Sequence, residues 1–188
     1  VERSRGLGDV YKRQILSQRE ERMGNEFSPL TGSELAILLC VPLFHVTGSH
    51  VSFLMSILVG RKIVMMKKWD AGEALKLIND EQVTDITGVP TQTWELLNHP
   101  DKNKYDLTSL KVLGGGGGPR PAEHVKQLDE NFKGRPGIGY GLTETNALGT
   151  LAGGDEYISN PSTAGRVVPP VTETVSYTHL RAHETSLH

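Results

Sequence analysis

Cysteine is nearly absent from this chain, because Cys40 is the only one in 188 residues. A single thiol excludes a disulfide framework and a thiolate metal cluster. Cys40 also lies within an apolar run, which is typical of a cysteine buried in a core. These features favour a reducing, cytoplasmic environment.

Long hydrophobic runs and an excess of one charge are also missing. The most apolar stretch, residues 51–59, is far shorter than the ~20 residues that cross a bilayer. Lysine and arginine number 20 and aspartate and glutamate 22, so the net charge is only −2. No polybasic run occurs. We therefore expect a soluble protein without a transmembrane segment and without a nucleic-acid partner.

The two ends of the chain differ from its middle. Residues 1–14 and 176–188 show neither helical nor strand periodicity, and the second stretch holds three of the seven histidines. Both resemble translated sequencing-adapter read-through, so we exclude them from the fold and expect residues 15–175 to be part of a domain of a longer protein. A pair of disordered native tails is the alternative.

Five short apolar runs alternate with helix-length segments in the middle of the chain. They are residues 34–44, 61–67, 83–87, 110–113 and 137–140. The first is continuously apolar, as in a strand covered on both faces of a parallel sheet. The repeated β-α-β order predicts an α/β fold, with an open, mostly parallel sheet covered by helices.

Three of the intervening segments have helical signals. Asp70 and Glu73 have the spacing of a capping box, and apolar residues then recur on one face, namely Ala71, Ala74, Leu75 and Ile78. Pro121 opens a second helix. Its expected buried face carries Ala122, Val125, Leu128 and Phe132. Residues 49–59 are apolar nearly all round, which predicts a buried helix.

A run of five glycines, Gly114 to Gly118, follows the fourth apolar run and precedes Pro119. Without a Cβ, such backbone can turn tightly and lie flat against a planar base. The carboxyl ends of parallel strands are where open α/β sheets bind ligands, and this run lies at such an end. A flexible connector is the alternative for the glycine run by itself.

A second informative segment follows the fifth run, at residues 137–145. Tyr140 lies between Gly139 and Gly141 and can stack on a base. Thr143 can donate its hydroxyl to a phosphate oxygen, and Glu144 can bind Mg²⁺, which prefers one or two carboxylates plus phosphate oxygens. The alternative is a tyrosine packed at a strand end beside a surface Thr-Glu pair.

Three motifs in order, PLFHVTG at residues 42–48, GGGGGPRPAE at 114–123 and GYGLTET at 139–145, resemble the adenylate-forming (AMP-binding) superfamily. The resemblance extends over about residues 15–174 and is closest to the AMP-forming acyl-CoA synthetases. It implies a partial N-terminal adenylation domain of an enzyme that converts a carboxylic acid, expected to be a fatty acid, and ATP to an acyl-adenylate, then transfers the acyl group to CoA. ATP or AMP, Mg²⁺ and CoA are therefore the expected ligands.

The resemblance also implies roles for individual residues. The adenine would lie against Gly116, Gly117, Gly118 and Pro119 and stack on Tyr140, with Gly139 and Gly141 beside it. Thr143 and Glu144 would take the phosphate and metal roles. His45 would border the acyl pocket near the substrate carboxylate, and residues 89–91 would form another wall.

The sequence departs from the family pattern at several points. Gly118 replaces a frequent alanine, and Arg120 stands where relatives are often apolar. The Ser/Thr/Gly-rich phosphate loop with its lysine is absent, and residues 15–19 resemble the helix that follows it, so we expect the fragment itself to be inactive. Two alternatives stay open. One is a sibling enzyme, either an amino-acid adenylation domain or a luciferase-like oxygenase. The other is a non-catalytic nucleotide-binding remnant.

Overall fold

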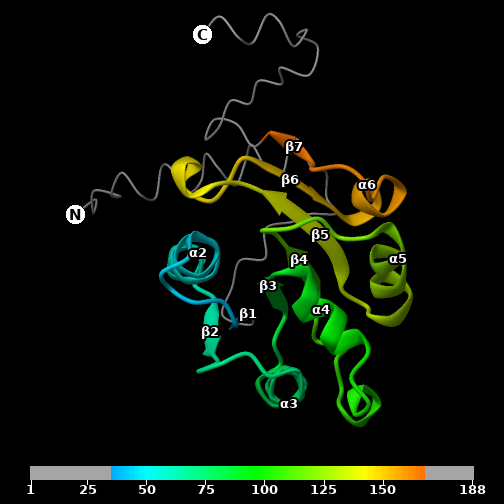
Figure 1. Cartoon of the computed structure of the whole chain (residues 1–188). Helices are drawn as coiled ribbons and strands as arrows, with labels where there is room; N and C mark the ends of the chain where they lie inside the picture. The colour runs from blue at the N-terminus through cyan, green and yellow to red at the C-terminus, as the bar shows by residue number, and fades with distance from the viewer. Residues whose placement is uncertain (1–34, 168–188) are drawn as a thin grey trace, which may run out of the picture.

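The computed structural model describes residues 35–167. Their strands form one sheet in the order β2-β1-β3-β4-β5-β6-β7 (Figure 1). The strands are β1 Ala36–Leu39, β2 Lys62–Met65, β3 Asp85–Gly88, β4 Val112–Gly115, β5 Arg135–Tyr140, β6 Thr150–Gly153 and β7 Arg166–Val167. Strands β1 to β5 pair in parallel, whereas β6 and β7 are antiparallel. The predicted α/β fold with a mostly parallel sheet is confirmed.

Helices cover both sides of the parallel strands. They are the π-helix η2 Thr47–Leu54, α2 Met55–Val59, α3 Ala71–Glu81, α4 Pro90–Leu97, the 3-10 helix η3 Lys102–Lys104, α5 Ala122–Asn131, the 3-10 helix η4 Thr143–Thr145 and α6 Gly154–Ser159. Figure 1 shows α2 across the strands from α4 and α5. Contacts run from α3 to α4, from α4 to α5 and from α5 to α6, so these four helices form a row.

The main core lies between this row of helices and the strands. All four residues of β1 are buried, as its continuous apolar sequence predicts for a central strand. Leu38, Ile86 and Leu113 contribute from three adjacent strands. Leu75, Ile78, Leu96 and Leu128 contribute from the helices. Each such side chain stabilises the fold by about 1.5–3 kcal/mol through burial.

One of the two hydrogen bonds of the capping box predicted at α3 is present, with Asp70 as the N-cap. The Asp70 carboxylate accepts a hydrogen bond from the Glu73 backbone N–H at 2.8 Å, and Ala74, Leu75 and Ile78 are buried. On α5, Val125 and Leu128 are buried, and so is Phe132 directly after the helix. Ala122 is exposed, contrary to the prediction, because it lies in the first turn, beyond the edge of the covered face.

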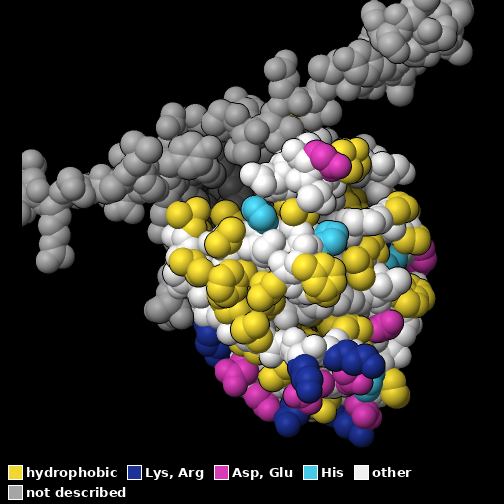
Figure 2. All heavy atoms as spheres, turned by 60° about the vertical axis from the view of Figure 1, so that its left-hand side comes forward, with side chains coloured by type: hydrophobic (Ala, Val, Ile, Leu, Met, Phe, Trp, Pro, Cys, Tyr) yellow, Lys and Arg dark blue, Asp and Glu magenta, His cyan; other side chains and the backbone are white. Residues whose placement is uncertain are grey.

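The prediction that residues 49–59 form a helix is confirmed, but the prediction that this helix is buried is wrong. The only buried residues of this segment are Ser52 and Ser56, which follow the buried Gly48. These small residues recur every four positions, so they form one stripe that faces the sheet. Leu54 and Ile57 are therefore exposed by 50% and 62%. Figure 2 shows hydrophobic side chains gathered on the face that it turns forward.

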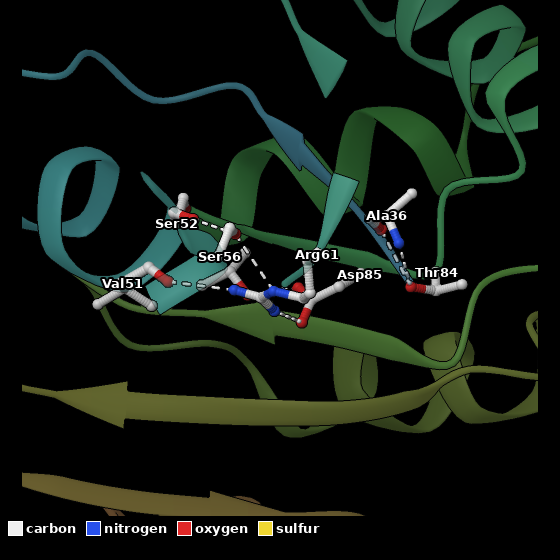
Figure 3. A network of polar contacts seen from close by, with 8 residues as sticks. Ala36, Val51, Ser52, Ser56, Arg61, Thr84 and Asp85 are labelled. Carbon is white, nitrogen blue, oxygen red and sulfur yellow. Dashed lines mark hydrogen bonds and ion pairs between the residues drawn. The ribbon is translucent and has the colours of Figure 1, made fainter. Parts of the chain in front are cut away.

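Arg61 joins this helical segment to the sheet (Figure 3). Its Nη1 lies 3.0 Å from the Asp85 carboxylate at the start of β3, and both side chains are largely buried. Nε donates to Ser56 Oγ at 3.2 Å and Nη2 to the Val51 carbonyl at 3.4 Å. The guanidinium thus connects two turns of η2 and α2 to the central strands.

Two details at the end of the sheet were not predicted. Strand β4 extends to Gly115, so two of the five glycines belong to the strand and only the other three form the turn. Strands β6 and β7 have four and two residues, too few to show a clear alternation in sequence. They complete the sheet next to β5.

Candidate functional site

A pocket of about 240 Å³ lies where the chain leaves the carboxyl ends of β1, β3 and β4. Its lining combines residues from three separate segments: Val41, Pro42, Phe44, His45, Thr47, Val89, Gly116 and Gly117. Most of the lining residues contribute either an apolar side chain or, at the two glycines, backbone without a side chain. Such a surface can accept a flat ring or a hydrocarbon chain, while His45 offers a polar contact.

His45 is presented by a tight turn between β1 and η2. The His45 N–H donates to the Pro42 carbonyl at 3.0 Å, and the His45 side chain accepts at Nδ1 from the Thr47 N–H at 3.2 Å. Because Nδ1 is an acceptor, the proton of the neutral ring lies on Nε2. The exposed ring can therefore donate from Nε2 to an anionic oxygen.

The glycine turn forms another part of the pocket wall. Gly117 has φ +74°, a left-handed conformation that favours glycine. The Gly116 N–H donates to the Gly88 carbonyl at 2.9 Å, which holds the turn against the end of β3. No heavy atom lies within 4 Å of a Cβ built on Gly118, and neither Gly118 nor Pro119 lines the pocket.

The end of β5 adjoins this turn. Gly116 and Gly139 form an isolated parallel bridge, so Tyr140 follows directly after a residue that pairs with the glycine turn. The Tyr140 side chain is 53% exposed. Gly141 has a packing reason of its own, because a Cβ there would lie 1.7 Å from the Ala147 carbonyl oxygen.

Thr143 and Glu144 lie in the short helix η4, and both are exposed. Thr145 fixes this turn, because its Oγ1 accepts from the Leu142 N–H at 2.9 Å and donates to the Leu142 carbonyl. Within residues 35–167, no group of three or more His, Cys, Asp or Glu side chains could hold a metal ion. A single carboxylate fits Mg²⁺ that also binds phosphate oxygens, rather than a metal held by protein alone.

The predicted site residues are thus placed at one edge of the sheet in two groups. His45, Gly116 and Gly117 line one pocket, with Val89 as the predicted second wall. Tyr140, Thr143 and Glu144 lie outside that lining, at the end of β5 and in η4 after it. A larger hollow of about 330 Å³, lined among others by Lys102, Tyr105 and Lys133, lies before β4 and β5, away from these motifs.

Sequence reasoning missed Gln92, a buried residue of α4 that connects two of the loops. Its side chain accepts from the Val89 N–H at 2.9 Å and donates to the Cys40 carbonyl at 3.1 Å. Nothing in the sequence marks this glutamine, because its partners are backbone groups of distant segments.

Burial raises the pKa of the neighbouring Cys40 thiol to about 12, so Cys40 stays protonated and is no nucleophile.

Comparison with known proteins agrees with this geometry. The sequence matches the model of the AMP-binding enzyme family over residues 11–175. The chain belongs to this family. In residues 35–167, no helix is long and apolar enough to cross a membrane.

Two curated members of the family show the extent of the match. A ligase of Rhodococcus jostii (strain RHA1), named for joining a substituted octahydroindenyl-propanoyl group to CoA, is 32% identical over 133 residues, which cover 70% of this chain and 26% of the relative. A luciferin 4-monooxygenase of Nipponoluciola cruciata is 36% identical over 155 residues, or 80% of this chain and 26% of the relative. This chain therefore spans about a quarter of the length of these relatives.

A solved structure shows the same fold. The o-succinylbenzoate coenzyme A synthetase of Bacillus subtilis, in complex with ATP and magnesium ion, superposes with a TM-score of 0.69 at 22% identity, over 86% of this chain and 31% of that one. Residues 1–14 and 176–188, which sequence analysis sets apart as foreign, lie outside the described residues, as does the segment at residues 15–19.

Proposed function

We propose that the whole protein containing this chain is an AMP-forming acyl-CoA synthetase. The observation that carries the proposal is one pocket whose lining includes both His45 and the Gly116–Gly117 turn. A carboxylic acid and ATP must meet in such an enzyme. This pocket places apolar side chains, which can contact the acid, next to glycine backbone, which can contact the adenine. The chain's membership of the AMP-binding family and its CoA-ligase relatives support the same reaction.

In the proposed reaction, a carboxylate oxygen attacks the α-phosphorus of ATP and pyrophosphate leaves. The CoA thiolate then attacks the carbonyl carbon of the acyl-adenylate, and AMP leaves. Little covalent work falls to side chains, so positioning and charge stabilisation carry the catalysis. The soluble, cytoplasmic setting expected from composition suits these substrates.

Each site residue has a proposed task. Tyr140 stacks on the adenine, which lies along the backbone of Gly116 and Gly117, with Gly118 and Pro119 closing the turn. Thr143 donates its hydroxyl to a phosphate oxygen. His45 donates from Nε2 to the carboxylate or phosphate oxygens. Glu144 would hold Mg²⁺, which when bound neutralises charge on the phosphate oxygens.

The substrate is proposed to be a hydrophobic carboxylic acid, such as a fatty acid. The acid would enter between His45 and the apolar wall formed by Val41, Phe44 and Val89. Phe44 is 92% exposed, so it is free to lie along a hydrocarbon substrate. A charged amino-acid substrate fits this wall less well, because the lining that residues 35–167 provide carries no acidic side chain to meet an ammonium group.

The test is pyrophosphate exchange into ATP by the whole protein, measured with a panel of fatty, aromatic and amino acids. We expect exchange that depends on a hydrophobic acid, and a thioester detectable by mass spectrometry once CoA is added. ATP binding without exchange for any acid would instead indicate a non-catalytic nucleotide-binding protein.

A luciferase-like reaction is the second candidate, because a luciferin 4-monooxygenase is among the relatives. It shares the adenylation step and differs in the second step, where oxygen rather than CoA reacts. Exchange without thioester formation, accompanied by oxygen consumption, would favour this candidate.

A further inference from the structure

Arg120 is a charged residue in an interior position. It follows the glycine turn and Pro119, and its side chain is buried, with only 5% of the residue exposed. Burial lowers the pKa of the guanidinium, but an arginine stays protonated in proteins. A full positive charge therefore lies inside the molecule, next to the pocket loop.

The partners of this charge are all neutral. Nη1 donates to the Gly137 carbonyl at 3.1 Å and to the Leu113 carbonyl at 3.5 Å, and Nη2 to Thr93 Oγ1 at 3.4 Å. The buried Tyr157 side chain also contacts the guanidinium. Arg120 Nε is buried without a hydrogen-bond partner. Among the residues that the structure describes, no carboxylate forms an ion pair with Arg120.

The guanidinium lies directly beneath the backbone that leads into the pocket. A Cβ built on Gly115 would lie 2.5 Å from Nη2 and 3.1 Å from Cζ, so the charge is in contact with the last residue of β4. The next residue, Gly116, lines the pocket. The carbonyl contacts to Leu113 and Gly137 also tie β4 to β5 at the level of this turn.

A buried charge is costly unless neighbouring groups compensate it, and neutral acceptors compensate it only in part. In the interior it is also poorly screened, so it acts on a nearby anion more strongly than a surface charge does. An anionic group bound above the turn would supply the missing compensation. A structural arginine with its own carboxylate partner would have no such effect.

We propose that Arg120 is a positioning residue that holds the glycine turn in place and, as a buried cation without an acidic partner, makes the pocket favour phosphorylated adenine ligands over unphosphorylated ones. The preference for phosphorylated ligands rests on the proposed nucleotide function. The role in holding the glycine turn does not, because the position of the turn can be measured without any ligand.

The test uses the 188-residue chain and three variants: Arg120→Met, which removes the charge; Arg120→Lys, which keeps it; and Arg166→Met as a control. Arg166 is an exposed arginine, with 84% of its side chain accessible, and pairs with Glu156 on the surface. Calorimetric titration with ATP, AMP and adenosine is compared with hydrogen exchange at the Gly116 amide, whose bond to Gly88 reports on the turn.

We expect Arg120→Met to weaken ATP and AMP binding about tenfold more than adenosine binding, and to speed exchange at Gly116. Arg120→Lys should retain the preference for phosphorylated ligands. Exchange at Gly116 should still be faster than in the original chain, because one ammonium group cannot replace the contacts of both guanidinium Nη atoms. Arg166→Met should change neither.

Equal losses for adenosine, AMP and ATP in Arg120→Met, or loss of the preference in Arg120→Lys, would overturn the charge role. Unchanged exchange at Gly116 in Arg120→Met would overturn the positioning role. If the unmodified chain bound none of the three ligands, the proposed nucleotide site and the charge role would both fail, while the exchange data would still decide the positioning role.

Discussion

Glu144 is the carboxylate on which the proposed magnesium role depends, and it lies exposed in η4. We predict that Glu144→Gln in the whole protein lowers the rate of adenylation on the order of 10²-fold, since one lost electrostatic element costs about that much. The measurement is acid-dependent pyrophosphate exchange at saturating ATP and Mg²⁺.

Glu130→Gln is the matched control, because Glu130 is an exposed carboxylate near the end of α5 that forms an ion pair with Lys126 on the helix surface. It should leave the exchange rate within about twofold. Near-normal exchange in Glu144→Gln would remove Glu144 from the proposed mechanism, whatever the control shows.

His124 is a buried histidine that the structure keeps neutral. Burial, and then the charge of Arg120, lower the pKa of His124 from 6.5 to about 4. Its ring packs edge-on against Trp94, with centroids 5.1 Å apart, and its Nε2 lies 3.4 Å from Thr93 Oγ1. An added proton would therefore place a second cation beside Arg120.

We predict that this histidine makes folding sensitive to acid. In the unfolded chain it binds a proton near pH 6.5, and in the folded chain only near pH 4. Its contribution to stability is thus complete above pH 6.5 and is lost as the pH falls toward 4, with a slope of up to about 1.4 kcal/mol per pH unit.

The measurement is urea unfolding between pH 4 and 7.5 for the original chain and for His124→Gln. The difference in slope between the two isolates the histidine from the carboxylates, which also titrate at the acid end. Parallel pH profiles for the two proteins would contradict the assignment.

At the scale of elements, the junction between the η2–α2 segment and the sheet contains a largely buried ion pair between Arg61 and Asp85. Removing one partner of a buried pair leaves an uncompensated charge and typically costs about 3–5 kcal/mol. We predict that Arg61→Met destabilises the chain by up to this amount, because the largely buried Asp85 carboxylate loses the positive charge 3.0 Å away and keeps only its other contacts, such as the hydroxyl of Thr87. Urea unfolding measures the loss.

The double variant Arg61→Met/Asp85→Asn should recover much of that stability, because it removes both charges. Lys62→Met is the control, since its pair with Glu81 is exposed and should be worth less than about 1 kcal/mol. If the double variant were no more stable than Arg61→Met, the loss would come from the contacts to Ser56 and Val51 rather than from the charge.

The helix at residues 49–59 shows how composition can mislead about burial. Its apolar residues occur all round, so the sequence alone indicates an interior helix. In the folded chain, the covered face of this segment is the one that carries Gly48, Ser52 and Ser56. These residues are small enough to let the helix approach the sheet closely. The stripe of small residues, rather than the total hydrophobicity, was the informative signal.

At the scale of the whole molecule, the described pocket has a glycine wall and an apolar wall but no lysine or arginine in its lining. A polyphosphate in this pocket would need cationic contacts from elsewhere in the protein, together with Mg²⁺. We predict that the 188-residue chain by itself forms no measurable acyl-adenylate, whereas the whole protein does. Acyl-adenylate formation is followed by mass spectrometry, with AMP binding by the chain as the control for a folded site.

Much of the architecture follows from the sequence because it depends on local rules. Continuous apolar runs indicate covered parallel strands, Asp70 marks the start of α3, and the order of strands and helices predicts the α/β class. The motifs at residues 42–48, 114–123 and 139–145 also predict which segments meet, since the carboxyl ends of parallel strands lie along one edge.

Only the tertiary structure decides how those segments fit together. The burial of Arg120 beneath Gly115, the Gln92 bridge between two loops and the outward-facing residues of α2 depend on contacts between segments distant in sequence. Local patterns specify which elements form and in what order. Where a charge is buried, and which face of a helix is covered, are set by the space that the assembled elements leave, and no single segment contains that information.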